Sequence, residues 1–302
     1  MEEKDLIERI KTLKKEKNAV LLAHVYQRPE IYKVADFIGD SFGLSKKATE
    51  TTAEIIVFCG VDFMAESAYI LNPNKTILIP TRLANCPMAA MVDVAGLRKL
   101  KAKHSRAAVV SYVNTTAYVK SESDVCCTSA NAVKVVNSLE EDAVIFVPDS
   151  NLADYVLRHT KKKIIPWNGW CYVHRRFSPE GLNRAKNNHV DAKVLVHPEC
   201  ISEVVDLADE VFSTTGMINY VKQSPDKTFI IATEIGLVER LKLMFPEKVF
   251  FQAPPGGTCL PMKRTTLKLV LDSLEKEQFK VTVPEDIRVR AKKALDRMLN
   301  VA

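Results

Sequence analysis

The chain repeats one order of expected elements three times, and this repeat limits its possible folds more than any other feature. Each unit has about 85 residues, and runs of β-branched residues alternate with helical patterns. Such alternation is typical of βα units with parallel strands. First strands are expected at 18–24, 106–114 and 191–199, third strands at 54–60, 142–149 and 227–234, and fourth strands at 75–81, 162–167 and 247–253. The sequence predicts an α/β fold of three similar αβα domains, with short parallel sheets around a pseudo-threefold axis.

The repeat also predicts domain boundaries. The three domains are expected at 1–86, 87–171 and 172–263. The N-terminal helix and the segment 264–302 fall outside the pattern, and their apolar residues recur at helical spacing. We expect 264–302 to pack on the first domain.

Polar residues keep their place in each repeat. His24, Tyr112 and His197 end the first strands in register. Two residues further on come Tyr26, Asn114 and Glu199, which would share a face of an extended strand. Three matched polar pairs at strand ends favour a site over three unrelated core residues.

Hydroxyl residues also share an offset. Ser41, Ser129 and Thr214 each stand 17 residues after the first polar position, close to the start of an expected helix. Such a hydroxyl can cap the helix, or the helix start can bind a carboxylate or phosphate. Three of them at one offset favour anion binding.

Three cysteines close the repeats. Cys86, Cys171 and Cys259 lie 85 and 88 residues apart, each in a loop after a fourth strand. Ligands of open parallel sheets gather at the carboxyl ends of strands, so we expect these thiols to meet at one point. They could hold a [4Fe–4S] cluster with one iron open as a Lewis acid, or a zinc ion with a fourth ligand. Sulfurs brought from three domains, without CxxC pairs, favour the cluster.

The remaining composition excludes several classes of function. The seven cysteines are an odd number, and Cys59, Cys126, Cys127 and Cys200 do not share the offset, so we interpret these four as structural.

The basic residues, which give a net charge of +6, are scattered among acidic ones, which argues against nucleic-acid binding and suits small anionic substrates. We find neither a signal peptide nor an apolar run of the ~20 residues that span a membrane, so we expect a cytoplasmic protein.

Several stretches of the chain resemble a known family. They are LLAHVYQRPEI, DFIGDS, GVDFMAE, NCPMA, YVNTTA, CTSANA, NGWC, VHPEC, STTGM, ATEIGLVERL and CLPMKRTTL. Together, and in this order, they resemble the quinolinate synthase A family of NAD biosynthesis. The resemblance implies one [4Fe–4S] cluster per chain, held by Cys86, Cys171 and Cys259. It implies condensation of iminoaspartate with dihydroxyacetone phosphate to quinolinate, phosphate and water, with a transient protein partner that supplies iminoaspartate.

The resemblance also implies roles for individual residues. The expected substrate-binding residues are His24, Ser41, Tyr112, Asn114, Ser129, His197, Glu199, Ser213 and Thr214. The expected catalytic residues are Glu199, as the proton-transfer group, with Tyr26, His24 and His197. The chain departs from many members at Val25, where Asn is common, and at Trp170. Strand alternation predicts that Val25 points away from the site.

Two other functions fit parts of the pattern. A zinc-dependent hydrolase or lyase could use the same pocket, and metal content would distinguish it. An iron–sulfur sensor would keep the cysteines but would not need the polar strand ends. The acidic residues Asp62, Asp149 and Glu234 also nearly share an offset, and the sequence leaves open whether they only cap helices.

Overall fold

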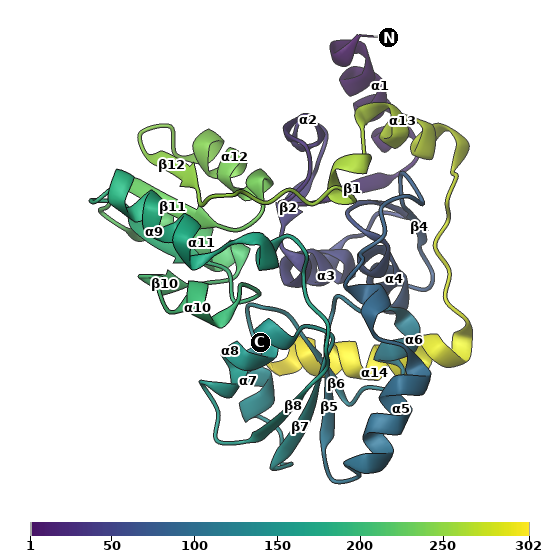
Figure 1. Cartoon of the computed structure of the whole chain (residues 1–302). Helices are drawn as coiled ribbons and strands as arrows, with labels where there is room; N and C mark the ends of the chain where they lie inside the picture. The colour runs from purple at the N-terminus through teal and green to yellow at the C-terminus, as the bar shows by residue number, and fades with distance from the viewer. Residues whose placement is uncertain (1, 302) are drawn as a thin grey trace.

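The computed structural model describes residues 2–301 and confirms the α/β fold. It contains three four-stranded sheets, and every strand pair within them is parallel. The strand orders are β2-β1-β3-β4, β6-β5-β7-β8 and β10-β9-β11-β12, so the same topology is used three times (Figure 1). The boundaries of the three domains stay a prediction.

The elements follow the repeat. The first repeat contains β1 (Ala19–His24), α2 (Pro29–Tyr32), β2 (Phe37–Gly39), α3 (Ser41–Glu50), β3 (Ile55–Cys59), α4 (Asp62–Leu71) and β4 (Thr76–Leu78). The second contains η1 (Ala89–Met91), α5 (Val94–Lys103), β5 (Ala108–Tyr112), α6 (Ala117–Lys120), β6 (Val125–Cys127), α7 (Ala132–Asn137), β7 (Ala143–Val147), α8 (Ser150–Leu157) and β8 (Lys163–Pro166). The third contains η2 (His174–Arg176), α9 (Pro179–Asn188), β9 (Lys193–Val196), α10 (Ser202–Val205), β10 (Glu210–Val211), α11 (Thr214–Gln223), β11 (Thr228–Ala232), α12 (Ile235–Met244), β12 (Val249–Gln252) and η3 (Met262–Arg264).

The central strands carry the cores. Every residue of β3 and of β5 is buried, as is expected of parallel strands with helices on both faces. The structural cysteines belong to these cores, since Cys59, Cys126, Cys127 and Cys200 are all buried. The candidate site residues lie at the carboxyl ends of these strands or in the loops that follow them.

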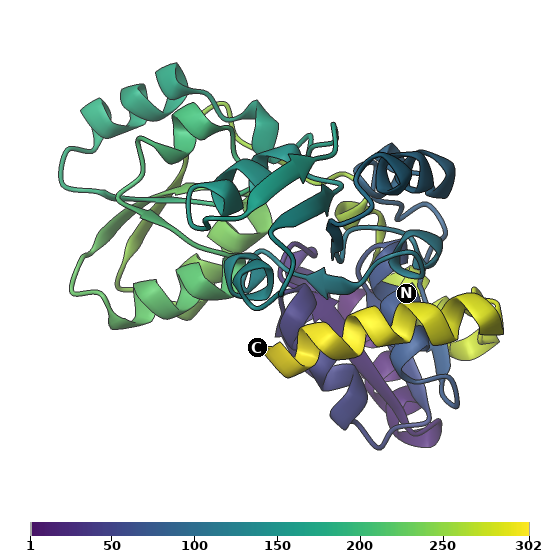
Figure 2. The same cartoon turned by 90° about the horizontal axis from the view of Figure 1, so that it is seen from below.

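The terminal helices join the repeats. Helix α1 (Glu3–Glu16) packs against α13 (Leu267–Lys276), which also contacts β3 of the first repeat, as expected. The long helix α14 (Glu285–Val301), yellow in Figure 2, differs from the expectation for the segment 264–302. It packs against α4 of the first repeat and against α6, α7 and β6 of the second. Its buried residues Ile287, Ala291, Leu295 and Met298 lie in one apolar cluster with residues of both repeats, so burying that face requires both.

Candidate functional site

The polar strand ends and the three cysteines line one inner cavity. Every predicted site residue except Ser213 contributes to its wall, and these residues come from all three repeats. The lining includes His24, Tyr26, Ser41, Cys86, Tyr112, Asn114, Ser129, Cys171, His197, Glu199, Thr214 and Cys259. Val25 does not line this cavity and belongs to an apolar cluster of the third repeat. The repeat therefore selected residues that the fold brings together.

The residues two places after the first polar positions do not continue a strand. Strand β1 ends at His24, and Tyr26 lies in a turn; β9 ends before His197, and Glu199 likewise lies in a turn. Backbone hydrogen bonds close these turns, from the N–H of Gln27 to the carbonyl of His24 and from the N–H of Cys200 to the carbonyl of His197, both at 2.9 Å. The N–H of residue 26 or 199 donates to the preceding histidine ring. The expectation that these pairs share a strand face is wrong, although both members still reach the cavity.

These turns fix the protons of two histidines. Nδ1 of His24 accepts the N–H of Tyr26 at 3.1 Å, and Nδ1 of His197 accepts the N–H of Glu199 at 3.3 Å. Burial lowers the pKa of His24 to about 3, with help from the charge of Lys263. Burial and the neighbouring His174 lower the pKa of His197 to about 3. Both rings are therefore neutral, and Nε2 carries the proton as a hydrogen-bond donor.

Glu199 is the centre of a buried hydrogen-bond network. Its Oε1 accepts the hydroxyl of Tyr112, and its Oε2 lies 3.0 Å from Nδ1 of His174. Burial alone raises the pKa of Glu199, but His174, His197 and the Tyr112 hydroxyl more than offset it and lower the pKa. Glu199 is therefore a carboxylate at neutral pH that accepts two hydrogen bonds.

The network continues to the first and third repeats. Nε2 of His174 lies 2.8 Å from Oγ1 of Thr233, and the same hydroxyl lies 2.8 Å from Oη of Tyr26. With Nδ1–H of His174 donating to Glu199, the consistent order is Tyr26 to Thr233 to His174 to Glu199. Rings of His174 and His197 also stack, with centroids 4.3 Å apart. One chain of hydrogen bonds thus links all three repeats.

His174 and Thr233 are missing from the predicted site residues. The positions that correspond to His174, three residues after each cysteine, are Ala89 and Met262, so the repeat gives no signal. The spacing Cys171-x-x-His174 is the one local pattern that could have indicated it. Thr233 lies at the end of a buried strand, where a hydroxyl is ordinary.

Capping does not explain the three hydroxyls at the shared offset. Ser41 and Thr214 are the first residues of α3 and α11, and the helices are capped by the preceding side chains of Asp40 and Ser213. Ser129 precedes α7 and does not cap it. None of the three is the capping residue of its helix, and all three line the inner cavity.

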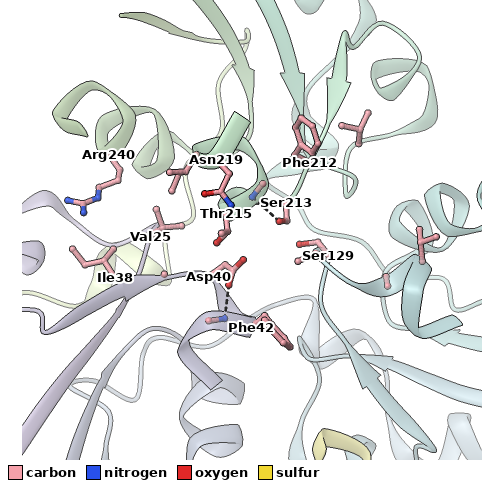
Figure 3. Close-up of a pocket in the computed structure, with 18 of the residues that line it drawn as sticks. Val25, Ile38, Asp40, Phe42, Ser129, Phe212, Ser213, Thr215, Asn219 and Arg240 are labelled. Atoms are coloured by element: carbon pink, nitrogen blue, oxygen red, sulfur yellow. Dashed lines mark hydrogen bonds between the residues drawn. The ribbon is translucent and has the colours of Figure 1, made fainter. Parts of the chain in front are cut away.

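A second, outer cavity of about 730 Å³ adjoins the first. Both cavities are lined by Asp40 and Ser129, and Ser213 lines only the outer one. Figure 3 shows Asp40, Ser129, Ser213 and Thr215 pointing toward one another from three parts of the chain. The shared lining shows that the two cavities adjoin, and the predicted residue Ser213 lies in the wall of the outer one.

The three candidate ligand cysteines have a common environment. Burial raises the pKa of Cys86 to about 12 and of Cys259 to about 11, and it raises the pKa of Cys171 well above its usual value. In each case a backbone N–H three residues on, from Ala89, His174 or Met262, partly offsets this by donating toward the sulfur. Such thiols ionise at neutral pH only when a strong electrophile binds them.

A single metal ion would find one set of donors of mixed type. Donor atoms of Cys171, His174 and Glu199 lie within 4.8 Å of one another. However, both ring nitrogens of His174 and both oxygens of Glu199 already have hydrogen-bond partners. Cys86 and Cys259 would be left without a role. The three sulfurs of one cavity fit the ligand set of an iron–sulfur cluster better.

Within residues 2–301, we find no helix with an apolar run long enough to cross a bilayer.

Comparison with known proteins gives consistent matches over nearly the whole chain. A sequence model of the quinolinate synthetase A protein family matches residues 8–300. The chain is 56% identical over 301 residues to a quinolinate synthase of Methanosarcina barkeri, covering 100% of this chain and 99% of that protein. It is 53% identical over 292 residues to one of Geobacter metallireducens, covering 97% and 96%, and 50% identical over 296 residues to one of Thermodesulfovibrio yellowstonii, covering 98% of each.

Proposed function

Because this chain belongs to the quinolinate synthetase A family, and its relatives are enzymes named quinolinate synthase, we propose that it makes quinolinate for NAD biosynthesis. The proposed reaction condenses iminoaspartate with dihydroxyacetone phosphate and releases phosphate and water. The observation that carries the proposal is the single inner cavity, lined by three cysteines and by polar side chains of all three repeats.

We further propose that Cys86, Cys171 and Cys259 hold a [4Fe–4S] cluster. Three cysteines leave one iron without a protein ligand, and when bound this iron supplies a Lewis acid for a departing hydroxyl. The N–H groups that point toward the sulfurs favour a negatively charged cluster at this place.

The substrates are proposed to bind between the helix starts and the histidines. Both are anions, and the N–H groups and hydroxyls at the starts of α3 and α11, with Ser129, offer donors to a carboxylate or phosphate. Nε2–H of His24 and of His197 supplies two further donors. The outer cavity, with Ser213 in its wall, is the proposed route of entry.

Glu199 is the proposed proton-transfer group. It is ionised and held in place by Tyr112 and His174, so it can take a proton from a substrate carbon next to a leaving hydroxyl. Tyr26 stands at the far end of the same chain of hydrogen bonds, and its one O–H is proposed to turn from Thr233 to a substrate oxygen when substrate binds. Burial keeps the Tyr26 pKa well above its usual value, so the hydroxyl acts as a donor rather than as a base.

The test is the metal content of protein purified without oxygen. About four irons and four sulfides per chain, with quinolinate formed from the two substrates, would support the proposal. One zinc and no sulfide after anaerobic reconstitution would overturn the cluster and favour the zinc-dependent alternative. A cluster without quinolinate formation would overturn the reaction.

A further inference from the structure

Each cysteine loop is tied to the start of a neighbouring helix by the same two hydrogen bonds. In the second repeat the N–H of Ser150 donates to the carbonyl of Gly169 at 2.8 Å. The N–H of Cys171, two residues after Gly169, donates to Oδ2 of Asp149 at 3.1 Å. The two bonds therefore hold the segment from the Gly169 carbonyl to the Cys171 N–H at both of its ends.

The third repeat uses the same positions. Its bonds are Ile235 N–H to Gly257 carbonyl at 2.9 Å and Cys259 N–H to Glu234 Oε1 at 3.0 Å. In the first repeat the acid stands one residue later, so Asp62 supplies both groups: its N–H donates to the Ala84 carbonyl at 2.9 Å, and its Oδ1 accepts the N–H of Cys86 at 3.2 Å. We call each pair of bonds a loop clamp. Three loop clamps at the starts of corresponding helices argue against a chance contact of one loop.

The carboxylates do more than cap helices. Asp149 and Glu234 have no exposed surface, and burying an acidic side chain is costly unless its oxygens accept hydrogen bonds. By contrast, Asp40 and Asp93 cap α3 and α5 by accepting a glycine N–H, and the structure of residues 2–301 gives neither a bond to a cysteine N–H. A helix can therefore be capped by an acid that accepts no cysteine N–H, so the additional bond needs another explanation.

We propose that Asp62, Asp149 and Glu234 are positioning residues, which hold the three cysteine loops so that the sulfurs face one point before a cluster binds. The inference rests on the proposed role of these cysteines as cluster ligands. Each cysteine is followed by a short turn, η1, η2 or η3, whose N–H points toward the sulfur. A loop clamp that fixes the peptide before the cysteine therefore also fixes the backbone N–H, three residues later, that donates toward the sulfur.

The clamps differ in which carboxylate oxygen they use. Oδ1 of Asp149 accepts the N–H groups of Asn151 and Leu152, both at 2.9 Å, while Oδ2 accepts only Cys171. In the first repeat, Oδ1 of Asp62 accepts both Phe63 and Cys86. An amide side chain has one oxygen, so Asp149→Asn keeps the helix cap and loses the cysteine bond, whereas Asp62→Asn keeps both.

Hydrogen exchange followed by mass spectrometry on the full chain tests this difference. In Asp149→Asn, the peptide that covers 168–173 should exchange at least about tenfold faster than in the wild type, because the buried bond from the Cys171 N–H to the Asp149 side chain is lost. Exchange of 83–88 in Asp62→Asn should stay within about twofold of the wild type. Asp93→Asn, at a helix cap that holds no cysteine, is the control for a change at a cap alone.

A second measurement uses the protein that carries its cluster. Iron should pass to a chelator at least about tenfold faster from Asp149→Asn than from the wild type and from Asp93→Asn. Equal exchange and equal iron release in wild type and Asp149→Asn would overturn the inference. If Asp149→Asn does not fold, Glu234→Gln removes the corresponding bond, since Oε2 accepts Gly236 and Oε1 accepts Cys259. It also removes the ion pair of Oε1 with Lys263 at 3.2 Å, so Lys263→Met is measured beside it as the control for that loss.

The two proposals fail in different ways. A wild-type chain without iron and sulfide would overturn the cluster proposal, whatever the exchange rates are. A wild-type chain with a cluster, whose cysteine loops exchange equally in all variants, would leave the proposed function intact and remove the positioning role.

Discussion

Glu199 is the candidate catalytic residue that the surrounding side chains hold most firmly, through Tyr112 on one oxygen and His174 on the other. We expect Glu199→Gln to lower kcat at least about 100-fold while iron and sulfide content stay unchanged, because an amide cannot accept the proton. Steady-state quinolinate formation, with iron analysis of the same sample, measures this.

Glu203→Gln is the matched control, since it makes the same chemical change in the same repeat. Glu203 lies on α10 and is exposed to solvent, away from the buried network, so this variant should keep full activity. Normal turnover by Glu199→Gln with an intact cluster would remove Glu199 from the proton-transfer role. Loss of the cluster in Glu199→Gln alone would instead assign the residue to the integrity of the site.

The burial of His24 predicts that the free energy of unfolding depends on pH. Its pKa is lowered from 6.5 to about 3 by burial, so the folded chain keeps the ring neutral while the unfolded chain protonates it below pH 6.5. The unfolded state binds more protons in this range, so His24 contributes a loss of stability as the pH falls from 6.5 toward 3. His24→Asn removes this contribution while its amide oxygen can still accept the N–H of Tyr26.

Denaturant unfolding of both proteins at about pH 7.5 and about pH 5.5 measures the effect. The free energy of unfolding of the wild type, relative to His24→Asn, should fall by about 1.4 kcal/mol between these two pH values. A difference that does not change with pH would mean that the ring titrates equally in the folded and unfolded chains.

At the scale of elements, the start of α11 links stability to the proposed anion site. Ser213 caps this helix by accepting the N–H of Gly216 at 3.3 Å, and Ser178 caps α9 in the same way with Gly181 at 3.1 Å. Ser213→Ala and Ser178→Ala should each lower the free energy of unfolding by about 1 kcal/mol. Only the first should raise KM for the phosphate-bearing substrate, by about three- to tenfold, because Thr214 at the start of α11 lines the inner cavity.

Thermal unfolding and steady-state kinetics of the two variants separate these effects. Ser178 lines neither cavity, so Ser178→Ala is the matched control for the loss of a cap. An equal KM in both variants would show that the start of α11 does not bind the substrate.

At the scale of the whole molecule, a bound cluster would join three repeats through one cysteine from each. Removing iron with a chelator should therefore lower Tm by at least about 5 °C, since a ligand that binds only the folded chain stabilises it. Cys171→Ser should show no such difference between reconstituted and chelated samples. Cys200→Ala should keep it, because Cys200 is buried within the core of the third repeat. Differential scanning calorimetry under nitrogen measures all three proteins.

Periodic features of the sequence determined the fold and most of the candidate site. Strand patterns recur in each repeat, so the three parallel sheets and the set Cys86, Cys171 and Cys259 could be predicted from spacing alone. Parallel strands of one sheet end at the same edge. The ends of β1, β5 and β9 belong to three sheets, and they lie together because the three repeats pack around one cavity.

Only the tertiary structure decided the features that occur once or that depend on contacts between repeats. His174 and Thr233 have no counterparts in the other repeats, and their roles arise from hydrogen bonds to Glu199 and, through Thr233, to Tyr26 of the first repeat. Helix α14 is amphipathic in the sequence, but only the packed repeats decide which apolar surfaces cover it. The carboxylates Asp62, Asp149 and Glu234 looked like helix caps, and their bonds to cysteine N–H groups exist because folding brings each loop back to the preceding helix. Local pattern specifies which elements form, whereas the partners of a buried polar group are set by the chain that folds against it.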